Sequence, residues 1–448
     1  MTLLPEGGEL WRLYNLRGSP FFQEALDPAP DAVYPIDLFV GREGDATRYI
    51  RWIESHPSSS RNVVAGAPGT GKTTLVQYIK DRVPNLISAS RPVSVGPSDG
   101  EEEVALRIID YVYRAIVARG DFTTHDNAAM KSARALVRTF PVTSRSGGLS
   151  GGYMGMSVGA SASAGTSYVT AAAKNPSLLI ETLLPELLGF AREHVGADGC
   201  LVHLNNMEHL ADADAARAAA TLRALRDRCL LLDGFHWLVV GTTESVDTVI
   251  RTHSQVRSVF PVYEPLGPLS VDDVVRLLER RYAHLVVPGR TPLPPVMPEV
   301  VRAVYALFNG DLRGTLQALD AAVTPLLGYA EGGPHAPLTA ETIAPTLRRI
   351  YGDQLARDLG EEEARRLESF IDATSVDPEG TTIRVLEELW KTSYTTANET
   401  VKRLVEAGYL APTTPTRPPT GRPAMRYGAT GASRLALLSL MGPDLRLR

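Results

Sequence analysis

The sequence predicts an α/β core built on a parallel sheet, followed by an all-helical domain and a helix-turn-helix domain. Three observations predict this organisation. Over residues 60–265, short apolar runs alternate with amphipathic helical patterns, which is typical of a parallel sheet with crossover helices. Over residues 269–360 only helical periodicity is present. After residue 361 a helix, a tight turn, a second helix and an apolar strand follow one another.

The composition is that of a soluble globular protein with room for two or three domains. Of the 448 residues, 44% are hydrophobic and 22% charged, and the formal net charge is −5. Any nucleic-acid surface must therefore be local. Two cysteines, Cys200 and Cys229, cannot build a disulfide framework and fit a reducing cytoplasm. No signal peptide or transmembrane run is visible, so we expect a cytoplasmic protein with no membrane partner.

A glycine-rich stretch lies between the first strand pattern, at 62–65, and a helical pattern at 74–80. It reads Gly66-Ala-Pro-Gly-Thr-Gly-Lys-Thr-Thr74 and fits G-x-x-x-x-G-K-[ST], the P-loop. Its glycines let backbone N–H groups and a helix N-terminus face a phosphate. We expect Lys72 to reach the β- and γ-phosphates of ATP, and the Thr73 hydroxyl to join a Mg²⁺ shell. The expected nucleotide contacts in this stretch are Gly66, Pro68, Gly69, Thr70, Gly71, Lys72, Thr73 and Thr74.

The remaining patterns divide the chain into four parts. Residues 1–38 form an aromatic, proline-punctuated N-terminal arm, which we expect to pack on the first domain. The other parts are the α/β core (39–267), the helical lid (268–360) and the C-terminal domain (361–448). Within the core, a second strand is expected in 87–95 and a last strand at 259–263, and helices are expected at 101–118, 128–140, 176–195 and 211–230.

Residues 144–170 interrupt the core pattern. From Met154 to Ala164, apolar residues alternate with Gly or Ser, a period of two that indicates an inserted β-hairpin. Such a hairpin would serve β-pairing or subunit contact. A flexible Gly/Ser loop fits the same composition.

Four further features occur in a particular order. Val40-Gly41-Arg42 precedes the P-loop, one strand ends in Asn205-Asn206, another ends in Thr242-Thr243, and Asn309-Gly310-Asp311-Leu312-Arg313 opens a lid helix. Over residues 38–330 the chain resembles AAA+ ATPases, most of all the initiator-type branch of origin-recognition and clamp-loader proteins. That branch carries a V-G-R box before the P-loop and a G-D-x-R signature in the lid.

The resemblance implies roles for these residues. Phe39 and Val40 would pack against the adenine ring beside Gly41 and Arg42. Arg313 would reach the γ-phosphate, because its planar fork pairs with phosphate oxygens, and ATP would thereby close the lid.

Two further positions matter for hydrolysis in the family. Thr242 or Thr243 would orient the attacking water, although threonines that cap a helix starting at Glu244 would look the same. Arg257 would act as an arginine finger on a neighbouring subunit, with Arg251 as its competitor.

One departure from the family lies at the end of the second-motif strand. The family places Asp-Asp or Asp-Glu where this chain has Asn205 and Asn206. Asparagine can hydrogen-bond a metal-bound water, so Asn205 remains a candidate for the Mg²⁺ shell, but it carries no charge and cannot act as a base. Glu208 would substitute only if the strand end is bent. We therefore expect ATP binding with slow or impaired hydrolysis.

The C-terminal domain resembles a winged helix-turn-helix. Thr396 and Glu399 suggest a capping box for its second helix, Gly408 ends that helix, and residues 411–427 would form the wing. Residues 391–448 carry nine basic and three acidic residues, a net +6 in a chain of −5. The expected contacts with duplex DNA are Thr395, Asn398, Lys402, Arg403, Arg417, Arg422 and Arg426.

The leading hypothesis is an ATP-binding AAA+ switch that associates with DNA and acts as an oligomeric regulator or loader in replication, transposition or anti-phage defence. Its subunit contacts would use the ATP site and the 144–170 segment. The alternative is a STAND-type signalling ATPase whose winged helix is autoinhibitory or protein-binding. A protein-binding winged helix would share the same sequence pattern.

Overall fold

The computed structural model describes residues 8–29, 31–96, 99–139, 176–251, 254–328, 336–374, 380–413 and 425–437. The predicted insertion at 144–170 lies outside these residues. The chain divides into two compact units. The core unit comprises Ala25–Ala67 and Gly71–Gly267, and the C-terminal unit comprises Met1–Glu24, Pro68–Thr70 and Pro268–Arg448. Among the described helices, none has the length and apolar character needed to cross a membrane.

The core unit is built on a parallel sheet. The strand order is β1-β5-β4-β2. Strand β2 pairs with the first residues of β4, and β3 pairs with its last residues. All strand pairs are parallel, as crossover connections require, so the predicted fold class of an α/β core is confirmed. The strands are β1 (Ser60–Ala65), β2 (Leu86–Ile87), β3 (Val93–Ser94), β4 (Gly199–Asn205) and β5 (Phe235–Gly241).

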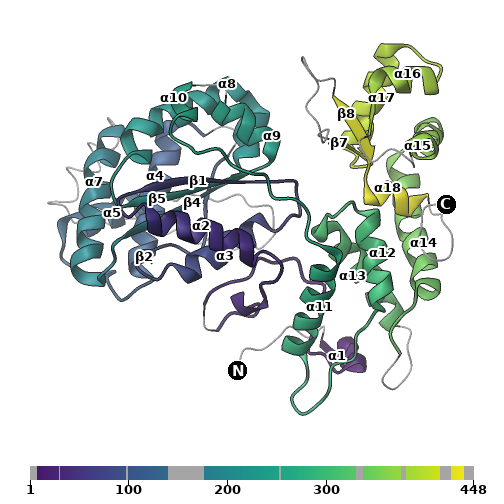
Figure 1. The fold of residues 1–448 in the computed structure, drawn as a ribbon, viewed down its shortest axis with the longest axis horizontal. Helices are drawn as coiled ribbons and strands as arrows, with labels where there is room; N and C mark the ends of the chain where they lie inside the picture. Colours follow the sequence, from purple (N-terminus) through teal and green to yellow (C-terminus); the bar gives the residue numbers. More distant parts are fainter. Residues whose placement is uncertain are drawn as a thin grey trace. The chain divides into compact units, whose positions relative to one another are not determined.

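Helices cover both faces of this sheet, with α8 and α9 on one side and α2 and α3 on the other (Figure 1). Alternate residues of β4 and β5, such as Val202 and Trp237, enter the main hydrophobic core. The helices of the core unit are η2 (Ile36–Leu38), α2 (Glu43–Ser55), α3 (Lys72–Arg82), α4 (Glu101–Val117), α5 (Ala128–Thr139), α7 (Pro176–Phe190), α8 (Met207–Leu225), α9 (Thr243–Val246) and α10 (Ser254–Arg257). Three π-helical turns, Ala191–Val195, Arg226–Leu230 and Asp247–Arg251, extend α7, α8 and α9.

Helix α4 shows how local sequence sets these elements. The backbone N–H of Gly100 donates to the Glu103 carboxylate at 2.8 Å, which is the half of a capping box that needs no N-cap side chain. Acidic residues in the first turn complement the helix dipole. Val104, Ile108 and Val112 repeat at four-residue intervals and are buried against the sheet.

The second predicted strand, within 87–95, is present as two short pieces. β2 and β3 both pair with β4, and the residues between them leave the sheet. Side chains of α3 hold this connection, because Gln77 donates to the Ser90 carbonyl at 2.8 Å and Lys80 donates to the Ala89 carbonyl at 2.8 Å. Pro92, which has no N–H to donate, lies immediately before β3.

The expected last core strand at 259–263 is wrong. That segment is irregular, and the Val262 side chain is 98% exposed. Pro261 and Pro265 remove the N–H donors that a strand would need. A single parallel bridge between Gly66 and Leu266 takes its place, with the Leu266 N–H donating to the Ala65 carbonyl at 2.7 Å.

After Pro268 the C-terminal unit continues with four lid helices that agree with the predicted helical pattern. Ser270 caps the first of them by accepting a hydrogen bond from the Asp273 N–H, and Pro298 occupies the first turn of the second. The lid helices are α11 (Val271–Leu285), α12 (Pro298–Leu307), α13 (Leu312–Gly328) and α14 (Ala340–Asp358).

Residues 8–24 of the N-terminal arm pack on these lid helices. They include α1 (Gly8–Trp11) and η1 (Arg12–Tyr14). The Arg17 N–H donates to the Leu285 carbonyl at 2.8 Å, and Arg281 of α11 donates to the carbonyls of Pro20 and Phe22 at 3.0 and 2.7 Å. The Arg281 guanidinium also lies 3.7 Å from the centre of the Phe22 ring. The expectation that the arm packs on the first domain is therefore wrong for residues 8–24.

The remainder of the C-terminal unit combines three helices, an antiparallel sheet of order β6-β8-β7 and a short last helix. The order of α16, α17 and β7 is the helix, helix and strand that the sequence predicted, whereas β6 and α18 were not predicted. Phe370, Leu386 and Leu404 lie in its core. The elements are α15 (Glu361–Thr374), β6 (Thr381–Thr382), α16 (Ile383–Leu389), α17 (Tyr394–Glu406), β7 (Leu410–Thr413), β8 (Arg426–Ala429) and α18 (Gly431–Ala436).

The cap of α17 differs from the prediction. Ser393, rather than Thr396, is the N-cap residue, and its hydroxyl accepts a hydrogen bond from the Thr396 N–H at 3.3 Å. The helix therefore begins at Tyr394, and the predicted capping box with Glu399 is not formed.

Candidate nucleotide-binding site

The P-loop connects β1 to α3 and has the backbone that phosphate binding requires. Gly69 and Gly71 have φ angles of 76° and 81°, a left-handed conformation that side chains rarely adopt. Gly71 is also the N-cap residue of α3. The first turn of α3, with Lys72, Thr73 and Thr74, therefore follows directly on a loop whose glycines let it curve closely around an anion.

Lys72 folds back over its own loop. Its Nζ donates to the carbonyl oxygens of Gly66 and Ala67 at 2.9 and 2.8 Å. The ammonium group is thus held beside the loop by neutral carbonyls. A phosphate group offers it a stronger, charge-assisted partner at the same loop.

The carboxyl ends of three strands meet next to the P-loop. The Gly66 N–H donates to the carbonyl of Gly241, the last residue of β5, at 3.3 Å. A Cβ on Gly241 would lie 2.9 Å from the Met207 Cβ and 2.9 Å from the Ser245 Oγ. The residues that follow β4 and β5 are therefore close-packed at the edge where the P-loop begins, which is where ligands bind in parallel sheets.

Thr242 has a local structural role at this edge. It is the N-cap residue of α9, and its Oγ1 accepts a hydrogen bond from the Ser245 N–H at 3.2 Å. The helix-capping explanation therefore holds for Thr242, with the helix beginning at Thr243 rather than Glu244. Thr243, the other residue predicted to orient the attacking water, lies in the first turn of α9.

The two asparagines after β4 differ in backbone conformation. Asn205 is the last residue of β4, and its carbonyl accepts from the Val95 N–H at 3.2 Å. Asn206 has a φ of 66° and precedes α8 as its N-cap. Asparagine tolerates this left-handed conformation better than most residues, which is a structural reason for Asn206 that the sequence pattern did not reveal.

Glu208, in the first turn of α8, has a carboxylate oxygen that lacks a partner. Its Oε2 atom is buried without a hydrogen bond. A buried carboxylate oxygen is costly to leave unpaired. Asn206, two residues before Glu208, has a left-handed backbone, so the chain bends after the end of β4.

These residues fit a Mg²⁺ ion bound together with nucleotide phosphates. Among the described residues, no three His, Cys, Asp or Glu side chains gather as a metal-binding group. Mg²⁺ bound to a nucleotide does not need such a group, because phosphate oxygens and water supply most of its ligands. Thr73 and Asn205 are the protein oxygens that would complete its shell. The ion would neutralise charge on the phosphates.

The Val-Gly-Arg box is buried in the core unit. Phe39 stacks on Tyr78 of α3 with ring centres 4.0 Å apart and an interplanar angle of 16°, and Val40 is buried beside it. Gly41 has a φ of 81°. Arg42 contacts Asp45 at 3.3 Å and donates to the carbonyl of Gly267, the last residue of the core unit. Arg42 thus anchors the point where the chain leaves the core unit, a role that motif matching did not suggest.

Within the C-terminal unit, the tip of the P-loop lies against the start of α13. A Cβ on Gly69 would lie 1.8 Å from Asp311 Oδ1 and 3.4 Å from the backbone N of Arg313. Asp311 caps α13 by accepting from the Arg313 N–H at 3.0 Å, and burial raises the pKa of the Asp311 carboxyl. The Arg313 side chain is exposed in the first turn. The sequence Gly310-Asp311-Leu312-Arg313 therefore places the backbone N of Arg313 close to Gly69, at the tip of the P-loop.

The two arginine-finger candidates differ in their surroundings. Arg251 pairs with Asp247 at 3.0 Å, and its guanidinium lies 5.6 Å from the centre of the Tyr263 ring. Arg257 is exposed at the end of α10. Both side chains are exposed, but that of Arg251 also contacts Asp247 and Tyr263.

Solved structures similar to this chain include a Cdc6p, an ORC bound to DNA and a Walker-type ATPase. Cdc6p from Pyrobaculum aerophilum has a TM-score of 0.40 and 14% identity, covering 95% of this chain and 100% of that one. Drosophila ORC bound to DNA has a TM-score of 0.42 and 12% identity, with coverage of 99% and 95%. A Walker-type ATPase of Pyrococcus abyssi has a TM-score of 0.44 and 12% identity, with coverage of 93% and 99%. No family model and no curated protein matches the chain.

The predicted DNA contacts fall into three groups. Thr395 and Lys402 are exposed on α17, and Asn398 is half-buried. Arg403 pairs with Glu363 at 2.6 Å, and Arg426 donates to the Gly380 carbonyl at 2.9 Å, so both already hold the domain together. Arg417 and Arg422 lie outside the described residues.

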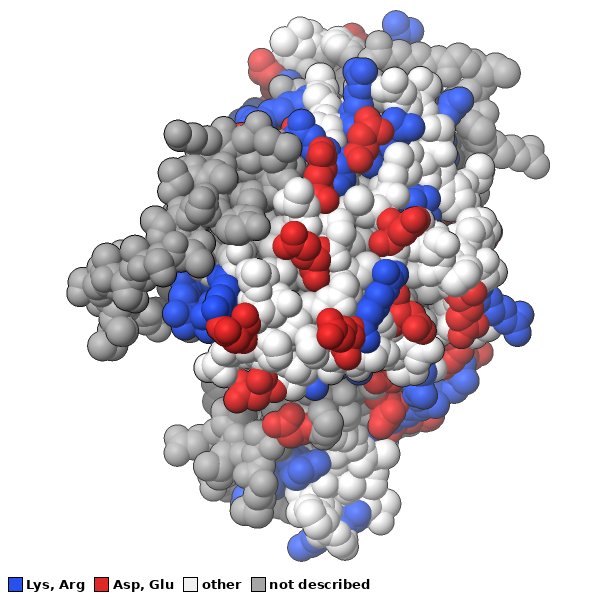
Figure 2. Space-filling view, turned by 90° about the vertical axis from the view of Figure 1, so that its left-hand side faces the viewer, with Lys and Arg blue, Asp and Glu red and all other residues white. Residues whose placement is uncertain are grey.

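Charge elsewhere is mixed in sign. Acidic and basic side chains are interspersed on the face shown in Figure 2. This agrees with the net charge of −5 and with the expectation that any basic surface is local.

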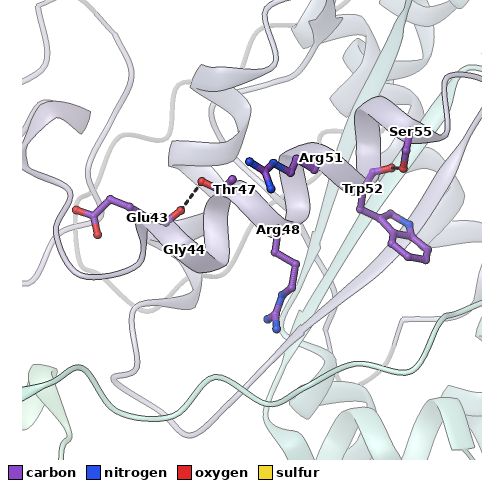
Figure 3. A pocket seen from close by; sticks show the side chains of 7 residues that line it. All are labelled: Glu43, Gly44, Thr47, Arg48, Arg51, Trp52 and Ser55. Atoms are coloured by element: carbon purple, nitrogen blue, oxygen red, sulfur yellow. Dashed lines mark hydrogen bonds between the residues drawn. The ribbon is translucent and has the colours of Figure 1, made fainter.

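A surface hollow on α2 was not anticipated from the sequence. It has a volume of about 710 Å³ and shares no residue with the P-loop. Arg48 and Trp52 project from the helix beside it, and Thr47 donates to the Glu43 carbonyl at 2.7 Å (Figure 3). Trp52 is 40% exposed and stacks on His56. The lining residues are Glu43, Gly44, Thr47, Arg48, Arg51, Trp52 and Ser55.

Proposed function

We propose that this protein is an ATP-binding AAA+ switch that associates with duplex DNA through its C-terminal domain. The observation that carries the proposal is the P-loop, with its two left-handed glycines and a lysine folded over the loop carbonyls. That arrangement supplies backbone donors, a helix N-terminus and a cation at one place, which is what a triphosphate needs.

The switch would depend on the lid. Asp311 positions the start of α13 against the P-loop tip, and Arg313 follows two residues later. A γ-phosphate there would add charge-assisted hydrogen bonds to Arg313 that ADP cannot make. ATP would therefore favour one lid state over the other.

Hydrolysis would be slow. Asn205 and Asn206 bring no negative charge to the strand end, and neither can accept a proton as a base. Glu208, with its unpaired oxygen, is the one carboxylate among the predicted site residues, and it follows a left-handed turn rather than the strand itself. Bound ATP would thus be held longer than in vigorous motors, as a switch requires.

DNA binding is tested by a salt titration with labelled duplex DNA, with and without ATP. Replacing Arg417, Arg422 and Lys402 by Ala should weaken binding and reduce the slope of log K against log salt by about 0.9 for each phosphate that the variant no longer neutralises. Arg349→Ala, at an exposed position of α14, is the matched control and should leave the slope unchanged. Absence of binding at low salt, or an unchanged slope in the triple variant, would contradict the DNA proposal.

A second candidate function follows from basic residues of the C-terminal domain that already have partners within the protein. Arg403 pairs with Glu363, and Arg434 of α18 donates to Asn309 in the lid. Such internal use of basic residues suits a STAND-type signalling ATPase, in which the C-terminal domain acts as a brake and the output is oligomerisation. Light scattering of the protein with ATP separates the two, because the signalling function predicts ATP-dependent assembly without any affinity for DNA.

A further inference from the structure

Helix α18 is a short element with contacts on two sides. It follows β8 directly and packs along α14, and Leu435 is fully buried. Sequence patterns assigned it no role. All of the interactions of α18 described below lie within the C-terminal unit.

One side of α18 meets the turn that opens α13. A Cβ on Gly431 would lie 2.3 Å from Phe308 Cδ1, and a Cβ on Gly314 would lie 2.5 Å from the same atom. The Phe308 ring therefore fits between two glycines, one from α18 and one from α13. No larger residue can occupy Gly431 without displacing that ring.

Arg434 strengthens the same contact. Its Nη1 donates to Asn309 Oδ1 at 2.7 Å and to the Leu307 carbonyl at 3.3 Å. Leu307 ends α12, so the guanidinium also meets the negative end of that helix dipole. Asn309 has a φ of 51° and begins the turn that leads through Asp311 to Arg313.

The other side of α18 meets the end of α17. Thr430, its N-cap residue, donates from Oγ1 to the Gly408 carbonyl at 2.9 Å, and its N–H donates to the Tyr409 carbonyl at 3.1 Å. The Ser433 hydroxyl also donates to the Tyr409 carbonyl. The Tyr409 hydroxyl in turn donates to Asp358, at the end of α14, at 2.9 Å.

We infer that α18 fastens the C-terminal domain to the lid, so that the Asn309–Arg313 turn and helix α17 move as one rigid body. Arg434 is a positioning residue in this connection, and Gly431 is the point of close approach. The consequence, that ATP bound at Arg313 reorients α17, rests on the proposed function. The rigid connection itself does not.

Distance measurements between spin labels test the connection. Labels at cysteines introduced at the exposed positions Gln317 of α13 and Glu406 of α17 report the distance between the lid and the C-terminal domain. The native Cys200 and Cys229 are buried, so the introduced sites take the label. The otherwise wild-type protein should give one narrow distance distribution that is the same with and without ATP. Arg434→Ala and Gly431→Ala should each broaden it or shift it.

Gly352→Ala is the matched control. Gly352 lies on α14 in the same interface, and its added Cβ would approach the Ala436 carbonyl oxygen only to 3.7 Å, an ordinary contact. This variant should keep the wild-type distribution. If Gly431→Ala unfolds the domain, Arg434→Ala, at a half-buried position, decides the matter. A broad distribution in the wild type, or one that Arg434→Ala leaves unchanged, would overturn the inference.

DNA titrations with these variants separate the inference from the proposed function. Arg434→Ala should keep the wild-type affinity for DNA without ATP within about twofold, and should lose the change in affinity that ATP produces. If the wild type binds no DNA, the proposed function fails while the distance distributions still decide whether α18 is a rigid connection.

Discussion

The Nζ atom of Lys72 lies 2.9 Å from the carbonyl oxygen of Gly66, the first residue of the loop that the lysine completes. The loop is therefore closed on itself by the same cation that would hold a phosphate. Binding of ATP would exchange two neutral acceptors for a charged one, which is the physical basis of the proposed affinity.

Replacing Lys72 by Ala should weaken ATP binding by about 100-fold or more, because a hydrogen bond to a charged group is removed. Titration calorimetry with ATP and Mg²⁺ measures this. Lys131→Ala, which removes an exposed ammonium of α5 that pairs with Asp126, is the control and should keep the wild-type affinity. Equal affinity of Lys72→Ala and wild type would exclude the P-loop as the ATP site.

Asn205→Asp should increase ATP turnover at saturating Mg²⁺, by about tenfold or more, because it places a carboxylate at the end of an extended strand where the metal shell is expected. Steady-state phosphate release provides the measurement. Wild-type turnover in the range of about 1–100 s⁻¹, typical of kinases, would refute the slow switch.

Asn206 should respond differently, since its φ is 66°. Asn206→Glu should lower stability by about 1 kcal/mol, the cost of a left-handed conformation for a residue with a longer side chain, whereas Asn206→Gly should be neutral or stabilising. Calorimetric unfolding of the two variants side by side checks this. A more stable Asn206→Glu protein would show that the turn relaxes on substitution.

His203 is buried in β4, and within the described part of the chain neither of its ring nitrogens has a hydrogen-bond partner. Burial lowers its pKa well below 6.5, so the unfolded chain takes up a proton below pH 6.5 while the folded chain does not. Stability should fall by about 1.4 kcal/mol per pH unit below that point from this group alone. His203→Leu should remove this loss and raise stability at pH 7 by about 1–2 kcal/mol. Unfolding measured at pH 7 and pH 5, with exposed His209→Leu as the control, decides this.

Lys80 gives a dependence of the same sign in a higher pH range. Burial lowers its pKa to about 7, from an ordinary value of 10.5. Between pH 7 and 8.5 the unfolded chain keeps this proton and the folded chain loses it, so stability should rise by about 1.4 kcal/mol per pH unit. Lys80→Met should abolish the rise, and Lys131→Met should retain it. A flat wild-type profile over this range would show that Lys80 stays charged in the folded protein.

Much of the fold could be predicted because its determinants are local. The P-loop glycines, the apolar period of α4 and the glycine at the end of α17 each act within a few residues of themselves. The sequence pattern therefore located β1, β4 and β5, the lid helices and the helix-turn-helix with small shifts at their ends. It placed the P-loop and the ends of β4 and β5 at one edge because parallel strands bring those ends together.

Predictions failed where several local signals competed. An apolar run at 259–263 favours a strand, but Pro261 and Pro265 remove its donors, and the Gly66–Leu266 bridge replaces it. Thr396 and Glu399 matched a capping box, but Ser393 was an equally good cap three residues earlier. In both cases the residue types allow the predicted element, but the backbone adopts another conformation.

By itself, the sequence determined that a P-loop motif joins a strand of a parallel sheet to a helix, and that a helical segment and a helix-turn-helix follow. Only the tertiary structure decided that residues 8–24 pack on the lid, that Arg42 holds the Gly267 carbonyl and that Arg434 joins α18 to the lid turn. The physical reason is sequence distance. A cap or a tight turn is set by neighbouring residues, whereas a guanidinium more than a hundred residues from its acceptor finds it only after the helices have packed.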